Sequence, residues 1–206
     1  MIAARTLVID TATQACSVAL IERGQIVGAA HEVVGRGHAE RLIPMIAALP
    51  GEGRAACILV DCGPGSFTGI RVGLAAAIGL GIGWGVPVTG YSSTALVAAA
   101  ALARRLGGQL AVVLEGGHGE VFMQAYADPL HAVTPLASLR PEAALAALED
   151  HVAIGTGVHH LLALDPSLSV IEAVPNAADA LLLPDALTSL PPRPIYGRAP
   201  DAVARI

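Results

Sequence analysis

The order of strand-like and helix-like segments is the feature that most limits how this chain can fold. Three consecutive runs rich in aliphatic and β-branched residues come first, and a Gly-Arg-Gly break separates them from an amphipathic helix. The first half gives strands at 5–9, 17–21 and 26–33, a helix at 38–49, a strand at 56–60, a helix at 70–84, a strand at 86–89 and a helix at 93–106. A meander followed by helix and strand alternation predicts a mixed sheet covered by helices.

The second half repeats this order after Gly107-Gly108. It gives strands at 110–114, 121–127 and 132–134, a helix at 141–149, a strand at 152–154, a helix at 158–164, a strand at 168–171 and a helix at 176–190. We therefore predict two α/β lobes, residues 1–107 and a smaller lobe of residues 108–206, each a βββαβαβα mixed sheet with helices. This is the layout of the two-lobed actin-like (ASKHA, ribonuclease H-like) fold of actin, sugar kinases and Hsp70. The analogy concerns the fold and not the function.

Composition excludes several classes of protein. With 54% hydrophobic and 14% charged residues, the 206-residue chain has the make-up of a globular protein and not of a disordered one. All 12 basic residues are arginines, so chemistry that needs a lysine is excluded. The 17 acidic residues give a net charge of −5, which argues against a protein that binds nucleic acid by itself.

Three features favour the cytoplasm. Cys16, Cys57 and Cys62 form no CxxC pair, and their odd number fits a reducing compartment better than a disulfide framework. The first residues run into a strand pattern without the ordered regions of a signal peptide. The most apolar stretch, 72–88, has 17 residues with five glycines, so we predict a buried helix plus strand and no membrane span.

Two loops carry groups that suit a phosphate. After the first strand, Asp10, Thr11 and Thr13 supply a carboxylate and two hydroxyls, which fit a phosphate or its Mg²⁺. A glycine-rich loop precedes the helix at 70–84 and begins a helix N-terminus, which favours anions; its candidates are Gly63, Gly65, Ser66, Thr68 and Gly69. The structural alternatives are an Asx turn at Asp10 and a tight strand-to-helix turn. Both alternatives stay open, as does binding of ATP or ADP.

The glycine-rich loop departs from three familiar motifs. A P-loop requires a lysine, and the sequence has none. The dinucleotide-binding GxGxxG pattern is missed by one residue, and no acidic residue between Asp61 and Glu115 is available for a ribose. A nucleophile elbow around Ser66 requires a glycine where Pro64 stands. Rossmann-type binding and serine hydrolysis are therefore not expected.

The seven histidines predict no metal site. The sequence contains no HxxxH or HExxH pattern, and His38 has Leu42 one turn later. His159 and His160 are adjacent, so we expect them to point to different sides of a helix.

The second half offers two further candidates. Glu115 and Glu120 flank a glycine-rich hairpin turn and suit either an acid/base pair or a solvated turn. Gly155-Thr156-Gly157 opens a helix that can face an adenosine in an actin-like cleft.

Three motifs together resemble the TsaB (YeaZ) family. They are VIDTATQACSVAL at 8–20, GHAERLIP at 37–44 and GPGSFTGIRVG at 63–73, with weaker support from VAIGTGV at 152–158 and PIYGRAP at 194–200. The resemblance runs in element order over about residues 5–127. One departure is Glu115-Gly116-Gly117-His118, where many members carry a DAR-type sequence.

The resemblance implies a bacterial subunit of the machinery that adds threonylcarbamoyl to adenosine 37 of tRNAs reading codons that begin with A. In that system TsaD transfers the group, and TsaB pairs with TsaD as a non-catalytic scaffold on which the ATPase TsaE docks. The catalytic paralogue holds a metal with an HxxxH helix, whereas the corresponding helix here has only His38. We therefore expect no catalytic residue, no required cofactor, and contact with tRNA only through the complex. The alternatives are an actin-fold ATPase or phosphotransferase using Asp10 with Mg²⁺, and a glycoprotease-like peptidase.

The resemblance also implies a partner surface, because in the family the first-lobe helices pack against the equivalent helices of TsaD. The residues that it implicates are His38, Leu42, Met45, Ile46, Leu49, Ile70, Arg71 and Leu74. When the partner is absent, we expect homodimers through the same helices.

Overall fold

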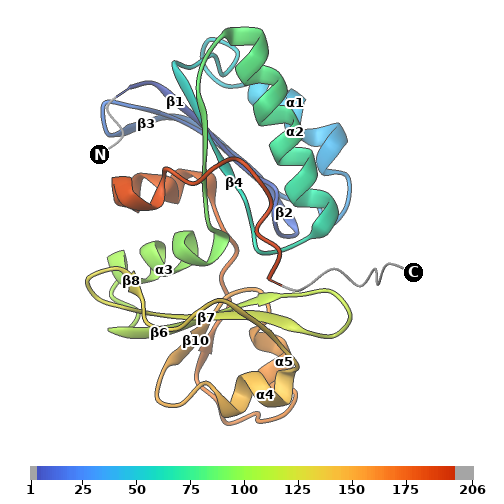
Figure 1. The fold of residues 1–206 in the computed structure, drawn as a ribbon, viewed down its shortest axis with the longest axis vertical. Coiled ribbons are helices and arrows are strands. Elements are labelled where there is room, and N and C mark those ends of the chain that lie inside the picture. The colour runs from blue at the N-terminus through green and yellow to red at the C-terminus, as the bar shows by residue number, and fades with distance from the viewer. Residues whose placement is uncertain (1–3, 198–206) are drawn as a thin grey trace, which may run out of the picture.

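The computed structural model describes residues 4–197, which form two β-sheets that follow one another along the long axis of the molecule (Figure 1). The first sheet has the strand order β3-β2-β1-β4-β5. Its strands are β1 (Thr6–Asp10), β2 (Ala15–Glu22), β3 (Gln25–Val33), β4 (Cys57–Asp61) and β5 (Val88–Tyr91). The first three strands are antiparallel neighbours, and β4 and β5 extend the sheet in parallel to β1. This is the meander with parallel additions that the sequence predicts.

Helices α1 (His38–Ala47) and α2 (Phe67–Trp84) lie side by side on one face of the first sheet (Figure 1). Leu7 and Ile9 of β1 point to this face and pack with both helices, whereas Val8 points to the opposite face. Alternate strand residues face opposite sides of a sheet, so β1, which is buried along its whole length, serves two cores at once.

Helix α3 (Ser93–Ala103) lies between the two sheets (Figure 1). Its residues 93–101 are all buried, and most of them are alanine, so the helix is apolar on every side. Such a helix is stable only when it is surrounded, and here it packs with Val8 of the first sheet and Val112 of the second. The central core therefore contains side chains from both sheets.

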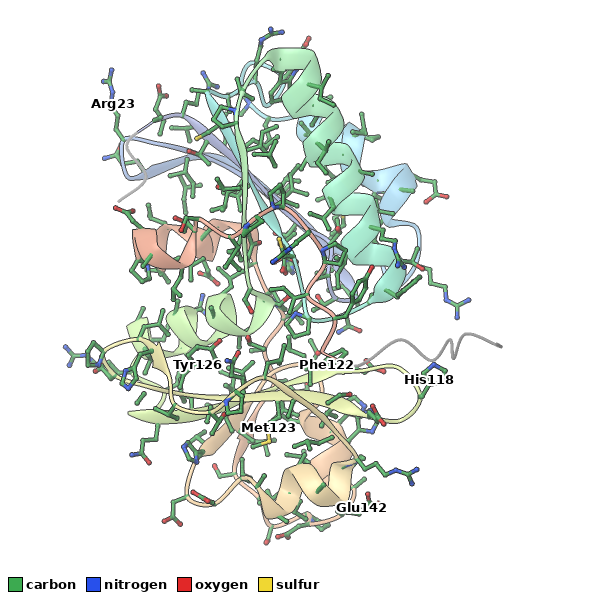
Figure 2. All side chains as sticks on the ribbon, viewed as in Figure 1. Arg23, His118, Phe122, Met123, Tyr126 and Glu142 are labelled. Carbon is green, nitrogen blue, oxygen red and sulfur yellow. The ribbon has the colours of Figure 1, made fainter. Side chains whose placement is uncertain are left out.

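The second sheet has the order β11-β10-β6-β7-β8, with β9 also paired to β7. Its elements are β6 (Gln109–Glu115), β7 (Val121–Ala127), β8 (His131–Ala132), β9 (Ala137–Leu139), β10 (Val152–Ile154) and β11 (Val170–Ile171), with helices α4 (Pro141–Ala146) and α5 (Val158–Leu162). Figure 2 shows Phe122 and Tyr126 of β7 on the side of the first lobe and Met123 on the side of α4. Met123 accordingly belongs to a separate core beneath α4 and α5.

The prediction of one helix at 176–190 is wrong. The chain forms two short 3-10 helices instead, η1 (Ala177–Leu182) and η2 (Asp185–Leu187). Leu183 between them is extended, with φ −74° and ψ 132°, because the following Pro184 disfavours helical backbone before it. The segment returns to the first sheet, where the Ala177 backbone N–H donates to Ser17 Oγ of β2 at 3.0 Å. The strands of the first sheet therefore all precede Gly107-Gly108, and those of the second sheet all follow it. The segment that contains η1 comes after this boundary in the sequence but packs on the first sheet.

Helix α2 is less buried than the sequence predicts. Among residues 4–197 it is the one helix that is long and apolar enough to cross a membrane, and 33% of its 18 residues are buried. One face packs on β1 and β4, which is the arrangement of a helix that covers a sheet. The other face of α2 is exposed.

Candidate functional site

A cleft of about 1020 Å³ lies between the two lobes, at the ends of their central strands. Its walls come from loops that are far apart in the sequence. The first lobe contributes the β1–β2 loop and the start of α2, and the second contributes the β6–β7 turn and the loop before α5. The polar residues along it are Thr13, Gln14, Arg36, Ser66, Thr68, Arg71, Glu115, His118, Glu120, Ser138, Thr156 and Tyr196. Parallel strands end at the same edge of a sheet, which is why ligand sites of open α/β folds form there.

Half of the predicted phosphate-loop residues line this cleft. Thr13, Gly65, Ser66 and Thr68 do so. The other four predicted residues are buried behind these and do not line the cleft: Asp10, Thr11, Gly63 and Gly69. Their prediction as residues that contact a phosphate is corrected accordingly. The Thr11 hydroxyl donates to the Gly69 carbonyl at 2.7 Å, so this hydroxyl holds the two loops together.

The glycines of the second loop allow α2 to start directly against the β1–β2 loop. A Cβ at Gly65 would overlap the Ala12 carbonyl, and one at Gly69 would overlap the Thr11 carbonyl. The backbone N–H of Ser66 donates to the Ala12 carbonyl at 2.6 Å, and the Ser66 hydroxyl accepts from the Gly69 N–H at 3.2 Å as the N-cap of α2. The tight-turn alternative therefore describes how this loop is built.

We expect Gly65→Val to lower the free energy of unfolding by about 1–3 kcal/mol, because the added side chain overpacks the contact with the Ala12 backbone. Urea denaturation of both proteins measures the difference. Gly108→Val is the matched control: the space around the Cβ position of Gly108 is open, so the same substitution there should change the free energy of unfolding by less than ~0.5 kcal/mol. Equal stabilities for Gly65→Val and the wild type would contradict the packing argument.

A buried pair of carboxyl groups, Asp10 and Asp61, lies behind the cleft. They end the neighbouring parallel strands β1 and β4, and they hydrogen-bond to each other. The Tyr91 hydroxyl donates to Asp10 Oδ2 at 2.9 Å. The Ser93 hydroxyl and the Gly63 N–H donate to Asp61 Oδ1 at 2.8 and 2.7 Å. These contacts hold Asp10 within the protein, so it does not offer a carboxylate to a phosphate or Mg²⁺ as the sequence suggested.

Burial controls the protonation of this pair. Loss of hydration raises the pKa of Asp10, and burial beside the charge of Asp10 raises the pKa of Asp61 well above its ordinary value of 3.8. Two carboxylates in contact cannot both be ionised at low cost, so Asp61 keeps a proton and donates it towards Asp10. The sequence analysis did not single out Asp61, Tyr91 or Ser93. The signal for Asp61 was its place at the end of a buried strand, which matches the place of Asp10.

The second-lobe wall of the cleft is held by hydrogen bonds. Glu120 accepts from the Ser138 hydroxyl at 2.6 Å, and the Glu115 backbone N–H donates to Thr156 Oγ1 at 3.0 Å. Glu115 and Glu120 both line the cleft, and Thr156 lines it directly before α5. His118 lies at the tip of the β6–β7 turn, at the right-hand edge of the second lobe in Figure 2.

An arginine in contact with two aromatic rings lines the cleft. The Arg71 guanidinium carbon lies 3.2 Å from the centre of the Phe67 ring and 5.6 Å from that of Tyr196. Arg71 also donates to the Tyr196 hydroxyl at 2.7 Å. Arg71 therefore ties α2 to the end of the described chain, and its aromatic partners were missed by the sequence analysis.

Most residues predicted at the partner surface are covered within the chain. Leu42, Met45, Ile46 and Leu49 are at most 6% exposed, and Ile70 and Leu74 are at most 5% exposed, in the core between the helices and the first sheet. His38 is also buried, where its Nε2 lies 2.9 Å from the Thr13 carbonyl and so donates to it. These seven residues fix the helices to the sheet, and of the predicted set only Arg71 is exposed.

A different set of residues forms the outer surface of these helices, which we name the α1–α2 face. Its large apolar side chains are Ile43, Phe67, Ile78 and Ile82, with exposed fractions of 49%, 65%, 40% and 79%. Between them lie the small exposed residues Ala47, Ala75, Gly79 and Gly83. Large exposed apolar patches of this kind mark interaction sites.

The expectation for His159 and His160 is wrong. Their ring centres lie 4.1 Å apart, so the two imidazoles are on the same side of α5. Together with Glu115 they form a group whose possible metal-ligating atoms all lie within 4.8 Å of one another.

Comparison with known proteins places these features in a family. The family model described as TsaD, tRNA N6-adenosine threonylcarbamoyltransferase, matches residues 20–136. The tRNA threonylcarbamoyladenosine biosynthesis protein TsaB of Escherichia coli is 32% identical over 166 residues, covering 74% of this chain and 71% of its own. An uncharacterized protein of Mycobacterium tuberculosis is 31% identical over 209 residues, covering 95% of this chain and 92% of its own.

Comparison with solved structures also finds a YeaZ protein. YeaZ from Pseudomonas aeruginosa superposes with a TM-score of 0.79 at 27% identity, covering 95% of this chain and 100% of that one. The two mixed sheets with their helices, together with this match, confirm the predicted two-lobed actin-like α/β fold.

Proposed function

The chain belongs to the TsaB (YeaZ) family, and on that basis we propose that it serves tRNA threonylcarbamoyladenosine biosynthesis in the cytoplasm as a non-catalytic subunit. In this proposal it pairs with a TsaD-type transferase, helps to recruit a TsaE-type ATPase and meets tRNA only through the complex. It needs no cofactor of its own. The observation that carries the proposal is the exposed α1–α2 face.

The composition of the α1–α2 face suits a tight helix-to-helix contact. On α2 its members recur at helical spacing, from Phe67 through Ala75 and Ile78 to Ile82, and Arg71 is the charged residue among the exposed positions of this helix. Gly79 and Gly83 let another helix approach closely beside Ile82. A solvated helix surface is normally polar, so 79% exposure of an isoleucine side chain indicates a surface that a partner covers.

A TsaD-type protein is the occupant that best fits this face. The TsaD family model matches residues 20–136, which include both α1 and α2. The partner therefore has an equivalent pair of helices, and two related helix pairs can meet about a pseudo-two-fold axis, with similar apolar surfaces facing each other. The same logic predicts that the chain alone forms homodimers through this face.

The interior of the first lobe supports a non-catalytic role. Asp10 is fully buried and bonded to Asp61 and Tyr91, so the proposed Mg²⁺ chemistry at this carboxylate has no open position. The one histidine in α1, His38, directs its Nε2 to backbone carbonyls of the β1–β2 region. These groups hold the fold and leave partner binding as the function of the outer surface.

Replacement of Ile82 by Glu tests the proposal. We expect the wild-type chain and the TsaD-type protein of the same organism to elute together as a one-to-one complex in size-exclusion chromatography with light scattering. Ile82→Glu should weaken this complex at least ~30-fold, the equivalent of ~2 kcal/mol for a central interface residue, and should also leave the chain monomeric when alone.

The control is Ile26→Glu, which makes the same substitution at another exposed isoleucine, 47% exposed, on the edge strand β3. It should pair like the wild type. Circular dichroism checks that both variants are folded. Absence of a complex with the wild type at micromolar concentrations, or equal losses with both variants, would overturn the assignment of the α1–α2 face.

A further inference from the structure

A cluster of two histidines and a glutamate lies at the second-lobe wall of the cleft, away from the α1–α2 face. His159 and His160 come from the start of α5, and Glu115 ends β6. The imidazole rings are inclined at 37° with their centres 4.1 Å apart, and the nearest ligand atoms of all three side chains fall within 4.8 Å of one another. Three side chains of metal-ligating type therefore converge on one point.

Thr156 forms hydrogen bonds with two of these residues, to the His159 side chain and to the Glu115 backbone. His159 Nδ1 lies 2.9 Å from the Thr156 carbonyl, and because a carbonyl only accepts, Nδ1 carries the hydrogen. The lone pair of the neutral ring is then on Nε2, which is the form that binds a metal. The Thr156 hydroxyl accepts from the Glu115 backbone N–H at 3.0 Å, which fixes the end of β6 beside α5. Such outer hydrogen bonds are a regular feature of metal sites.

We propose that Glu115, His159 and His160 bind a divalent transition-metal ion of the Zn²⁺ type. Imidazole nitrogens favour such ions over Mg²⁺ and Ca²⁺, which prefer oxygen ligands. In a tetrahedral zinc site with bonds of about 2.0–2.1 Å the ligand atoms are ~3.3 Å apart, so the three groups must close in slightly. Glu115 and His159 are exposed and have the freedom to do so.

The site would be incomplete with protein ligands alone. Three side chains leave the fourth tetrahedral position to water or to another ligand. Glu115 and Thr156 both line the cleft, so an ion bound by Glu115 would lie beside the cleft wall. The site is independent of partner binding through the α1–α2 face.

Cobalt titration of the 206-residue chain, without a tag, tests the site. Co²⁺ bound to histidine and carboxylate absorbs visible light, and Zn²⁺ displaces it, so both affinities can be measured. We expect one ion per chain. His159→Gln and Glu115→Gln should each weaken binding by more than the ~10–100-fold that loss of an outer hydrogen-bond partner costs. Zn²⁺ should also raise the melting temperature of the wild type, because it binds the folded state.

His131→Gln is the matched control. His131 is exposed, and its Nδ1 also lies against a backbone carbonyl, that of Pro129 at 2.6 Å, but it is not a member of the cluster. This variant should bind Co²⁺ like the wild type. Equal affinities for the wild type and His159→Gln, or a loss with His131→Gln alone, would show adventitious binding to surface histidines and would overturn the proposal.

Discussion

Leu42→Glu will prevent the chain from folding, whereas Ile82→Glu, one helix away, will leave the fold intact. Leu42 is 1% exposed in the core between α1, α2 and the first sheet. Truncation of such a leucine costs about 2–5 kcal/mol, and a glutamate adds the cost of a buried polar or charged group without a partner. The sum is comparable to the whole free energy of unfolding of a typical domain, about 5–15 kcal/mol.

Soluble expression and thermal unfolding by circular dichroism measure this effect. Leu42→Ala keeps the test informative where the glutamate variant cannot be purified, since it should fold and melt well below the wild type. At concentrations low enough to keep the wild type monomeric, Ile82→Glu should melt within a few degrees of it, because surface changes usually alter stability by less than ~0.5 kcal/mol. A Leu42→Glu protein with the melting temperature of the wild type would show that α1 does not pack on the sheet through this residue.

This contrast shows what helical periodicity can and cannot predict. The spacing of Leu42, Met45, Ile46 and Leu49 correctly indicates a helix with one apolar face, but an apolar face fits a sheet as well as it fits a partner. In α2 apolar residues occur on all sides of the helix, so the sequence does not distinguish the buried Leu74 from the exposed Ile82. Only the packing of α2 on β1 and β4 distinguishes them.

The sequence predicted those residues of the candidate site whose position follows from the end of a nearby strand. Thr13, Gly65, Ser66 and Thr68 follow strand ends, and they line the cleft because parallel neighbours end at one edge. Tyr196 could not be found in this way, since it reaches Arg71 from 125 residues away. The spacing rule for helices also failed at His159 and His160. It describes the directions of Cβ atoms, while side-chain torsions decide where the rings lie.

The pair Asp10 and Asp61 will make the stability of the protein fall as the pH rises. In the unfolded chain Asp61 loses its proton near its ordinary pKa of 3.8, and in the folded protein burial and the charge of Asp10 raise that pKa well above this value. Between the two, the folded state holds the extra proton. The stabilisation is therefore fully present below the unfolded pKa and is lost as the pH rises through the folded one. The slope is about 1.4 kcal/mol per pH unit for one proton.

Asp61→Asn should remove this slope. The amide is the same size as a protonated carboxyl group: its N–H₂ can donate to Asp10, and its oxygen can accept from Gly63 and Ser93, without a proton that titrates. Urea denaturation at a series of pH values measures the free energy of unfolding of both proteins. The variant should be the more stable one at high pH, and its advantage should shrink as the pH falls. Asp150→Asn, at an exposed aspartate, controls for the general effect of removing a carboxylate. Parallel pH profiles for the wild type and Asp61→Asn would mean that Asp10 and Asp61 do not share a proton in the folded protein.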